Sequence, residues 1–285
     1  MISQRKLTVS CEFFPPRTDA GFIKLRDVRE QLKALNPEFF SVTFGAGGST
    51  QARTVETVTD IQASGTPAAP HLSCVASTAE NIEQLLNEYI KHDISRIVAL
   101  RGDTPSGWMG RLGEFAYASE LVKFIRDKTG NHFHIEVAAY PEFHPQARSA
   151  KADLDYFKQK VEAGADSAIT QYFYNADAYF RFVDNCTARG VTIPIVPGIM
   201  PISNFEQLVR FSGTCGAEVP RWLQYLLKDQ EDDLDALQNL GLDVVTALCE
   251  KLIAGGAPGL HFYSLNQSKL LLELGQRLGL IQSVC

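Results

Sequence analysis

Short apolar segments alternate with amphipathic helical segments along the whole chain, and this alternation limits its fold more than any other feature. Apolar runs such as Leu7–Phe14 are typical of parallel strands that are buried on both faces. Apolar residues at helical spacing follow this run, at Leu25, Val28 and Leu32. The strand starts are roughly 26 to 38 residues apart, with one wider gap before the last. The eight predicted strands are Leu7–Phe14, Phe39–Thr43, Ala69–Val75, Arg96–Arg101, His134–Tyr140, Ser167–Tyr172, Ile193–Ile199 and Gly259–Tyr263.

Eight strand–helix units in a chain of 285 residues predict an α/β fold, the (βα)8 TIM barrel, as a single domain over residues 1–285. A doubly wound open sheet is the alternative. It usually has fewer strands, and its Gly-x-Gly-x-x-Gly phosphate motif is missing after the first strand, where Pro15–Pro16 stands. Two capping-box patterns, Ser77–Glu80 and Ser203–Glu206, predict helices that open at Ser77 and Ser203.

The charge balance and the cysteine pattern argue against several classes of function. Lys and Arg total 27 and Asp and Glu total 33, so the net charge of -6 offers no basic surface to nucleic acid or to an anionic membrane. No apolar stretch approaches the roughly 20 residues of a membrane span, and the first residues lack the apolar core of a signal peptide, so we expect a cytoplasmic protein. The six cysteines form no Cys-x-x-Cys pair, and His71 and His144 have no metal-ligand spacing. Neither a disulfide framework nor a metal site is therefore predicted.

Polar residues stand at the predicted strand ends. In a barrel the carboxyl ends of all strands meet at one mouth, where rigid strands hold functional side chains. Glu12 lies at the end of the first strand, because Pro15–Pro16 cannot continue its hydrogen-bond ladder. The loop Gly45–Thr50 can present backbone N–H groups to a phosphate. The other polar residues at strand ends are Thr43, His71, Arg101, Asp103, Tyr140, His144 and Gln171.

Motifs at these strand ends occur together in one known family. The chain resembles methylenetetrahydrofolate reductase, and the resemblance follows the chain in order over nearly its whole length. The motifs that carry it are Glu12–Pro16, Ser41–Gly48, Ala69–Leu72, Leu100–Asp103, Ala139–Pro145, Ala163–Ala165, Ile169–Phe173, Pro197–Pro201 and His261–Asn266.

The resemblance implies an eight-stranded barrel that binds FAD without a covalent bond. It implies that hydride passes from NADH or NADPH through the flavin to 5,10-methylenetetrahydrofolate, giving 5-methyltetrahydrofolate for methionine biosynthesis. A homo-oligomer is also expected. Because no second domain follows the barrel in this sequence, the inhibition by S-adenosylmethionine that is found in longer relatives is not implied.

The resemblance also implies roles for individual residues. Glu12 would be the general acid, and Asp103 would lie beside both the flavin and the folate. Thr43 is alternatively a contact of the nicotinamide nucleotide. Gln267 stands where many relatives have an arginine that contacts folate, so we expect a weaker contact there. The implied folate contacts are Asp103, Gln171, Gln207, Gln267 and the stacking ring of Phe211. The implied flavin contacts are Thr43, Phe44, Ala46, His71, Arg101, Gly102, Asp103, Ala118, Tyr140, His144, Ala147, Asp153 and Lys160.

The reduction needs both a proton donor and an anion. Protonation of the leaving nitrogen opens the five-membered ring of the folate and produces an iminium cation, which then accepts hydride. Glu12 can supply the proton if its pocket raises its pKa, while an ionised Asp103 can stabilise the cation in a low-dielectric site.

Two other classes of function fit parts of the same pattern. A glycosidase would use Glu12 and Asp103 as its acid and base, but it would not explain the arginine, the histidines and the glycine-rich loop at the same mouth. A flavin- or folate-binding protein without turnover would hold Glu12 for packing alone. Turnover with a nicotinamide nucleotide separates the enzyme from the binding protein, and a flavin absorbance spectrum separates both from the glycosidase.

Overall fold

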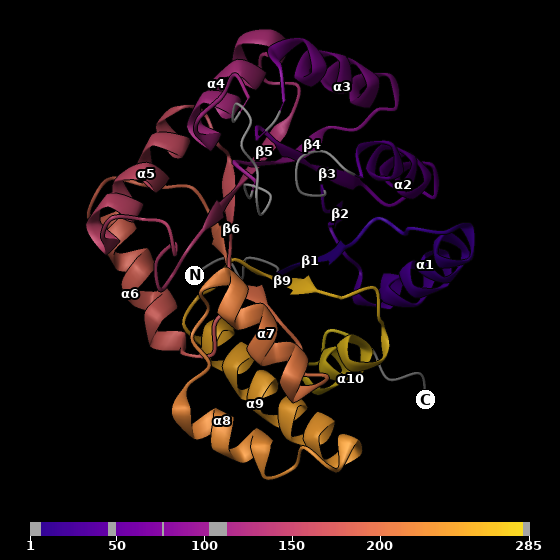
Figure 1. The fold of residues 1–285 in the computed structure, drawn as a ribbon, viewed down its shortest axis with the longest axis vertical. Coiled ribbons are helices and arrows are strands. Elements are labelled where there is room, and N and C mark those ends of the chain that lie inside the picture. Colours follow the sequence, from indigo (N-terminus) through magenta and orange to yellow (C-terminus); the bar gives the residue numbers. More distant parts are fainter. Residues whose placement is uncertain (1–6, 45–49, 76, 103–112, 282–285) are drawn as a thin grey trace, which may run out of the picture.

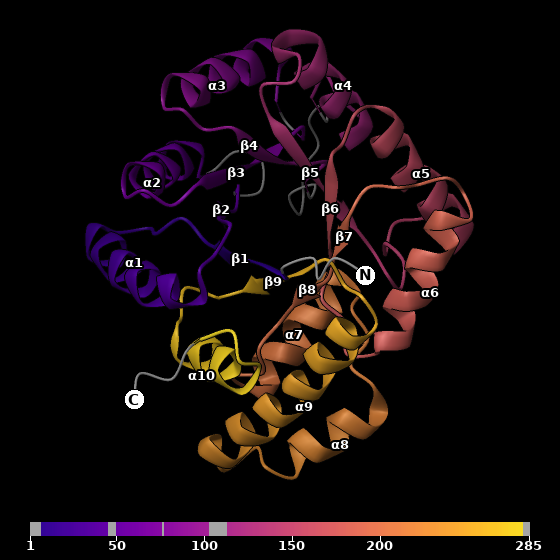
Figure 2. The same cartoon turned by 180° about the vertical axis from the view of Figure 1, so that it is seen from behind.

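The strands of the protein form one parallel sheet that curls into a nearly closed barrel, with the helices outside it (Figure 1, Figure 2). The computed structural model describes residues 7–44, 50–75, 77–102 and 113–281. The strand order is β7-β6-β5-β4-β3-β2-β1-β9-β8. The prediction of a (βα)8 TIM barrel is therefore confirmed. The strands are β1 Thr8–Phe13, β2 Phe39–Val42, β3 Ala68–Ser73, β4 Arg96–Leu100, β5 His134–Ala139, β6 Ser167–Thr170, β7 Ile195–Val196, β8 Gly198–Ile199 and β9 Gly259–Tyr263.

The predicted strand Ile193–Ile199 is interrupted at Pro197, which is why two short strands, β7 and β8, stand where one was expected. β7 pairs with β6, and β8 pairs with β9. Pro197 has no N–H to donate, but its carbonyl accepts a hydrogen bond from His261 N at 3.0 Å. Gly198 N donates to Thr170 Oγ1 at 2.9 Å. The segment thus connects to both of its neighbours and brings the two edges of the sheet together.

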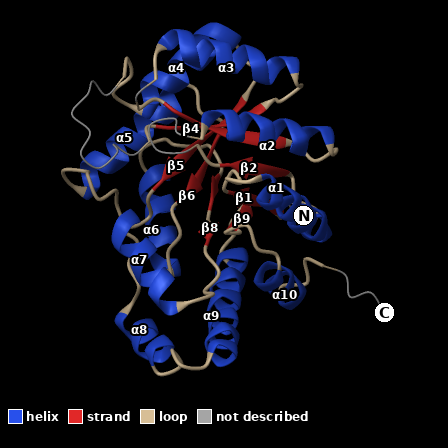
Figure 3. Cartoon of the chain, turned by 45° about the vertical axis from the view of Figure 1, so that its right-hand side comes forward, coloured by secondary structure: helices blue, strands red, loops and turns tan. Residues whose placement is uncertain are grey.

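The helices cover the outer face of the barrel, and α8 with one end of α9 extends away from it (Figure 3). No bounds were predicted for the helix after the last strand, α10, although Leu270, Leu271 and Leu274 have helical spacing and are buried in it. No helix of the described segments is both long enough and apolar enough to cross a bilayer. The helices are α1 Asp19–Leu32, the 3-10 turn η1 Lys33–Leu35, α2 Gln51–Ala63, α3 Ala79–Lys91, α4 Ala118–Thr129, α5 Ala150–Glu162, α6 Ala176–Thr187, α7 Phe205–Cys215, α8 Arg221–Lys228, α9 Leu234–Ala254 and α10 Lys269–Arg277.

Both predicted capping boxes are wrong by one residue. The N-cap of α3 is Thr78 rather than Ser77, and its side chain accepts a hydrogen bond from Asn81 N. The N-cap of α7 is Asn204 rather than Ser203. Each pattern contains two adjacent residues that can cap a helix, and the chain entering from the barrel decides which of them takes the extended backbone that a cap needs.

Side chains alternate between the two faces of each strand, and the two faces differ in chemistry. Outward residues such as Cys11, Phe40 and Leu72 belong to the main apolar core beneath the helices. Inside the barrel, a smaller apolar cluster consists of Phe39, Ala69, Val98 and Ile169. Other inward positions are polar and buried, namely Ser10, Ser41, His71, Glu136 and His261. The barrel interior therefore brings ionisable groups from distant strands together.

One inward network lies at the amino end of β4 and the middle of β5. Arg96 pairs with Glu136, which is buried, and also with the more exposed Glu38. Ser167 donates a hydrogen bond to Glu136, and His134 Nε2 lies 3.3 Å from its carboxylate. Burial would raise the pKa of Glu136, but the hydrogen bond from His134 and the charge of Arg96 hold it below its usual value. The network therefore contains an ionised carboxylate inside the barrel.

Candidate active site

A cavity of about 420 Å³ lies at the carboxyl ends of the strands, where the sequence predicted the functional mouth. We call it the central cavity. Its walls come mainly from the ends of β1 to β6, from β9 and from α7. The predicted site residues that line it are Glu12, Thr43, Phe44, His71, Gly102, Tyr140, Gln171 and Phe211.

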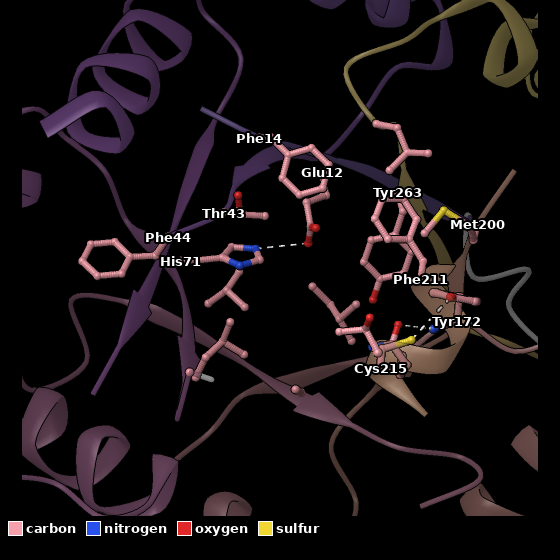
Figure 4. Close-up of a pocket in the computed structure, with 18 of the residues that line it drawn as sticks. Glu12, Phe14, Thr43, Phe44, His71, Tyr172, Met200, Phe211, Cys215 and Tyr263 are labelled. Atoms are coloured by element: carbon pink, nitrogen blue, oxygen red, sulfur yellow. Dashed lines mark hydrogen bonds and ion pairs between the residues drawn. The ribbon is translucent and has the colours of Figure 1, made fainter. Parts of the chain in front are cut away.

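Glu12 lies near the end of β1 on its inner face and points into the central cavity toward His71 (Figure 4). Its Oε2 lies 3.3 Å from His71 Nε2 and 3.6 Å from His261 Nε2. Burial would raise the pKa of Glu12, but the charge of His71 and the ring nitrogens of both histidines lower it to about 2. The protein without ligands therefore does not meet the condition of a raised pKa, because the two histidines outweigh the burial.

His261 is a site residue that the sequence did not predict, and it is fully buried on β9. Its Nδ1 lies 2.7 Å from Ser10 Oγ, so the other ring nitrogen faces Glu12. Ser10 and Glu12 are two residues apart on β1 and share the inward face. The alternation of side chains along β9 could have predicted that His261 points into the barrel. No local pattern pairs it with a carboxylate about 250 residues earlier.

The turn after β9 is hydrogen-bonded to the end of β1. Ser264 donates to the backbone carbonyl of Glu12 from both its N–H and its Oγ. Asn266 brackets Phe14, because its Oδ1 accepts from Phe14 N at 2.8 Å and its Nδ2 donates to Phe14 O at 2.9 Å. Leu265 and Asn266 have φ of 52° and 57°, a left-handed backbone that is uncommon outside glycine and that asparagine adopts more readily than most residues. These bonds fix the backbone that carries Glu12.

The wall of the central cavity on the side away from His71 is aromatic and is built by α7, β9 and the end of β6. Phe211, Tyr172 and Tyr263 gather on this side of the central cavity (Figure 4). The hydroxyl of Tyr172 lies 3.0 Å from Ser212 Oγ, and Cys215 Sγ lies 3.4 Å from the same hydroxyl. Such a wall suits a flat ring system.

A second cavity of about 330 Å³ adjoins the central cavity, and both are lined by Leu100, Gly102, Ala138 and Tyr140. The described lining of the second cavity contains Arg and Lys residues, whereas that of the central cavity contains none. Lys160 Nζ donates to Ala138 O at 2.5 Å, and burial lowers the pKa of this lysine to about 8. The predicted site residues that line the second cavity are Arg101, Gly102, Ala118, Tyr140, His144, Ala147, Asp153 and Lys160.

The structure does not bring every predicted residue to these cavities. Gln207 lies on α7 but is not among the described lining residues, and Gln267 lies outside the described lining of the central cavity. Gln267 follows the turn at Leu265 and Asn266, both of which have positive φ. Ala46 and Asp103 lie outside the described residues. The ligand contacts assigned to the residues that do line the cavities stay predictions.

The family is decided by comparison with known proteins. The family model described as methylenetetrahydrofolate reductase matches residues 1–279. The chain belongs to this family. It is 38% identical to the 5,10-methylenetetrahydrofolate reductase of Escherichia coli (strain K12) over 277 residues, which cover 97% of this chain and 92% of that protein.

Other relatives are longer or more distant. Methylenetetrahydrofolate reductase (NADH) 1 of Arabidopsis thaliana is 38% identical over 98% of this chain, but the match covers 49% of the plant protein. Among solved structures, an uncharacterized protein from Clostridium thermocellum that binds two copies of 5-methyl-5,6,7,8-tetrahydrofolic acid aligns over 96% of this chain and 93% of its own, with a TM-score of 0.66 and 15% identity. That likeness supports the barrel fold.

Proposed function

We propose that the protein reduces 5,10-methylenetetrahydrofolate to 5-methyltetrahydrofolate with NADH or NADPH as the electron source and FAD as the cofactor, in one βα-barrel domain. The observation that carries the proposal is Glu12, a carboxylate held between two histidines in a cavity with an aromatic wall. Membership in the methylenetetrahydrofolate reductase family supports the same reaction. The product is proposed to supply methionine biosynthesis in the cytoplasm, and a homo-oligomer stays a prediction.

The described residues fit a flavin dinucleotide. Arg101, Arg148 and Lys160 give the second cavity a positive side suited to phosphates. Gly102 lines both cavities. Its φ is +82°, and a Cβ at this position would lie 1.9 Å from Ser73 Oγ, so glycine is required there. The ring nitrogen Nε2 of His71 is buried, and its described polar contact is the one with Glu12. When bound, FAD supplies the two-electron carrier between the nicotinamide nucleotide and the folate.

Glu12 is the group of this chain that delivers the proton. In the reaction one C–N bond of the methylene bridge breaks, a hydride ends on the methylene carbon, and the leaving nitrogen takes up one proton. Because the pKa of Glu12 is about 2 in the protein without ligands, the carboxylate must gain a proton as the substrate binds. A folate that fills the cavity excludes water and so raises this pKa. The facing Nε2 atoms of His71 and His261 are close enough to pass a proton to Glu12.

Two alternatives are separated from this proposal by experiment. A glycosidase would use Glu12 with Asp103, which lies outside the described residues, and it would bind no flavin. The test is to purify the protein, record its absorbance with and without added FAD, and assay oxidation of NADH and NADPH with 5,10-methylenetetrahydrofolate. A preparation that binds no flavin and oxidises neither nucleotide would refute the proposal. Flavin binding without turnover would favour the other alternative, a flavin- or folate-binding protein that is not an enzyme.

FAD affinity should depend on the charge of Lys160. Burial lowers the pKa of this lysine to about 8, with the charge of Asp153 acting in the opposite direction. The charged form that suits a phosphate is therefore present below pH 8 and is lost as the pH rises through that value. We expect the dissociation constant of FAD to increase up to about tenfold between about pH 7 and about pH 9.

Fluorescence titration of apoprotein with FAD measures this dependence. Lys160→Met should bind FAD more weakly, and its affinity should no longer change over this pH range. Lys158→Met is the matched control, since Lys158 lies on the same helix and pairs with Glu162 at the surface. An equally steep pH dependence in Lys160→Met would show that another group controls binding.

A further inference from the structure

The described lining of the central cavity contains no lysine or arginine for the charged end of the proposed substrate. A reduced folate ends in a glutamate whose carboxylates are ionised at neutral pH. None of the described residues that line the central cavity is Lys or Arg. Aromatic and apolar walls can hold the ring system, but they cannot stabilise carboxylates that leave water. Among the described residues, a lysine or arginine for the tail is therefore to be sought at the rim of the cavity.

One face of α7 forms part of this rim. Phe211 and Thr214 line the central cavity. On a helix, residues three and four positions apart lie on the same face, so Arg210 is in one row with Gln207 and Thr214. Thr214 Oγ1 donates back to Arg210 O at 3.0 Å, which orients this turn. Arg210 therefore lies next to the cavity wall.

The guanidinium of Arg210 is held against this wall and is available to a ligand. Its central carbon lies 5.5 Å from the centroid of the Phe211 ring. Arg210 is exposed, and no carboxylate of the described residues forms an ion pair with it. By contrast, Arg126 and Arg277 each pair with a carboxylate. A guanidinium that stacks on a ring keeps its N–H edge free for bidentate binding of a carboxylate.

Gln267 cannot supply this charge. It is neutral, and it does not belong to the described lining of the central cavity. We propose that Arg210 binds the carboxylates of the folate's glutamate tail, while Phe211 beneath it contacts the aromatic part of the same ligand. This inference rests on the proposed function.

The experiment compares two substrates that differ only in the glutamate. The holoenzyme is assayed with 5,10-methylenetetrahydrofolate and with 5,10-methylenetetrahydropteroate, which lacks the tail. Arg210→Gln should raise KM about 3- to 10-fold for the first substrate and leave the second unchanged, because an ion pair at an exposed rim is partly screened by water. Arg210→Lys, which keeps the charge, should raise the KM for the first substrate by less than Arg210→Gln does. Arg221→Gln removes an equal charge from α8, where Arg221 bonds the Tyr225 hydroxyl, and should change neither substrate.

A direct binding measurement keeps the inference separate from turnover. Calorimetry with 5-methyltetrahydrofolate and 5-methyltetrahydropteroate gives the same comparison without any reaction. A protein that turns over neither substrate would count against the proposed function, while the ratio of the two affinities would still decide the role of Arg210. Equal losses for both ligands in Arg210→Gln, equal losses in the Lys and Gln variants, or no loss at all would overturn the assignment.

Discussion

Glu12→Gln should stop the folate-dependent half of the reaction while the half that reduces the flavin continues. Gln has nearly the same shape as Glu and can still hydrogen-bond to His71 and His261, so the barrel should fold and bind FAD. Its amide has no acidic proton to give to the leaving nitrogen. Proton donation contributes about 10² to 10⁴ in rate, so folate-dependent reoxidation should slow by that factor, or roughly 3 to 5 kcal/mol of barrier.

Stopped-flow absorbance of the bound flavin measures each half separately. Reduction by NADH or NADPH should stay within about twofold of the wild type, because that half takes no proton from Glu12. Ser10→Ala is a useful companion variant, since it removes the bond to His261 Nδ1 and leaves Glu12 in place. It should slow reoxidation less than Glu12→Gln does. A Glu12→Gln protein that loses both halves equally would indicate damaged folding or lost flavin, and one that keeps both would exclude Glu12 as the acid.

Glu136→Ala should lower the free energy of unfolding by about 3 kcal/mol, the lower end of the range for breaking a buried ion pair. The substitution takes from the half-buried Arg96 its buried carboxylate partner and removes the acceptor of the Ser167 hydrogen bond. Glu38 still pairs with Arg96 at the barrel's edge, which limits the loss. Urea unfolding followed by circular dichroism measures the change.

The pH dependence of this effect has a definite sign. The pKa of Glu136 is lower in the folded protein than in the unfolded chain, so its contribution is complete above the unfolded pKa. That contribution is lost as the pH falls through the folded pKa. The difference in the free energy of unfolding between the wild type and Glu136→Ala should therefore disappear at acidic pH. Asp127→Ala is the control, because it breaks the exposed pair with Lys123 and should cost less than about 1 kcal/mol. A gap that stays constant down to strongly acidic pH would mean that Glu136 acts through packing and not through charge.

Much of the fold could be predicted from the sequence, because its signals are local. Apolar runs of strand length, helical spacing between them and their regular repetition predicted the barrel, and β1 to β6 appear close to their expected bounds. Pro15–Pro16 placed Glu12 at the carboxyl end of β1, and the structure confirms that position. The motifs at the strand ends were sufficient to indicate the methylenetetrahydrofolate reductase family.

The features that could not be predicted depend on contacts between distant residues. The apolar runs did not show that inward positions form polar layers, so the network around Glu136 was missed. Pro197 breaks one predicted strand, yet hydrogen bonds with both neighbours keep the segment in the sheet. Leu265 and Asn266 have positive φ, and Gln267 after them is outside the described lining of the central cavity, so its folate contact stays a prediction.

Neighbouring residues along the chain specify which strand carries the proposed acid and at which end of the barrel it lies. The ionisation state of that acid is a property of the folded barrel. Burial raises the pKa of Glu12, and the imidazoles of His71 and His261 lower it. The balance depends on the distances of 3.3 and 3.6 Å between these rings and the carboxylate. These rings come from β3 and β9, and closure of the barrel sets their separation from β1. A pKa depends on such distances through space, and the order of residues along the chain does not contain them.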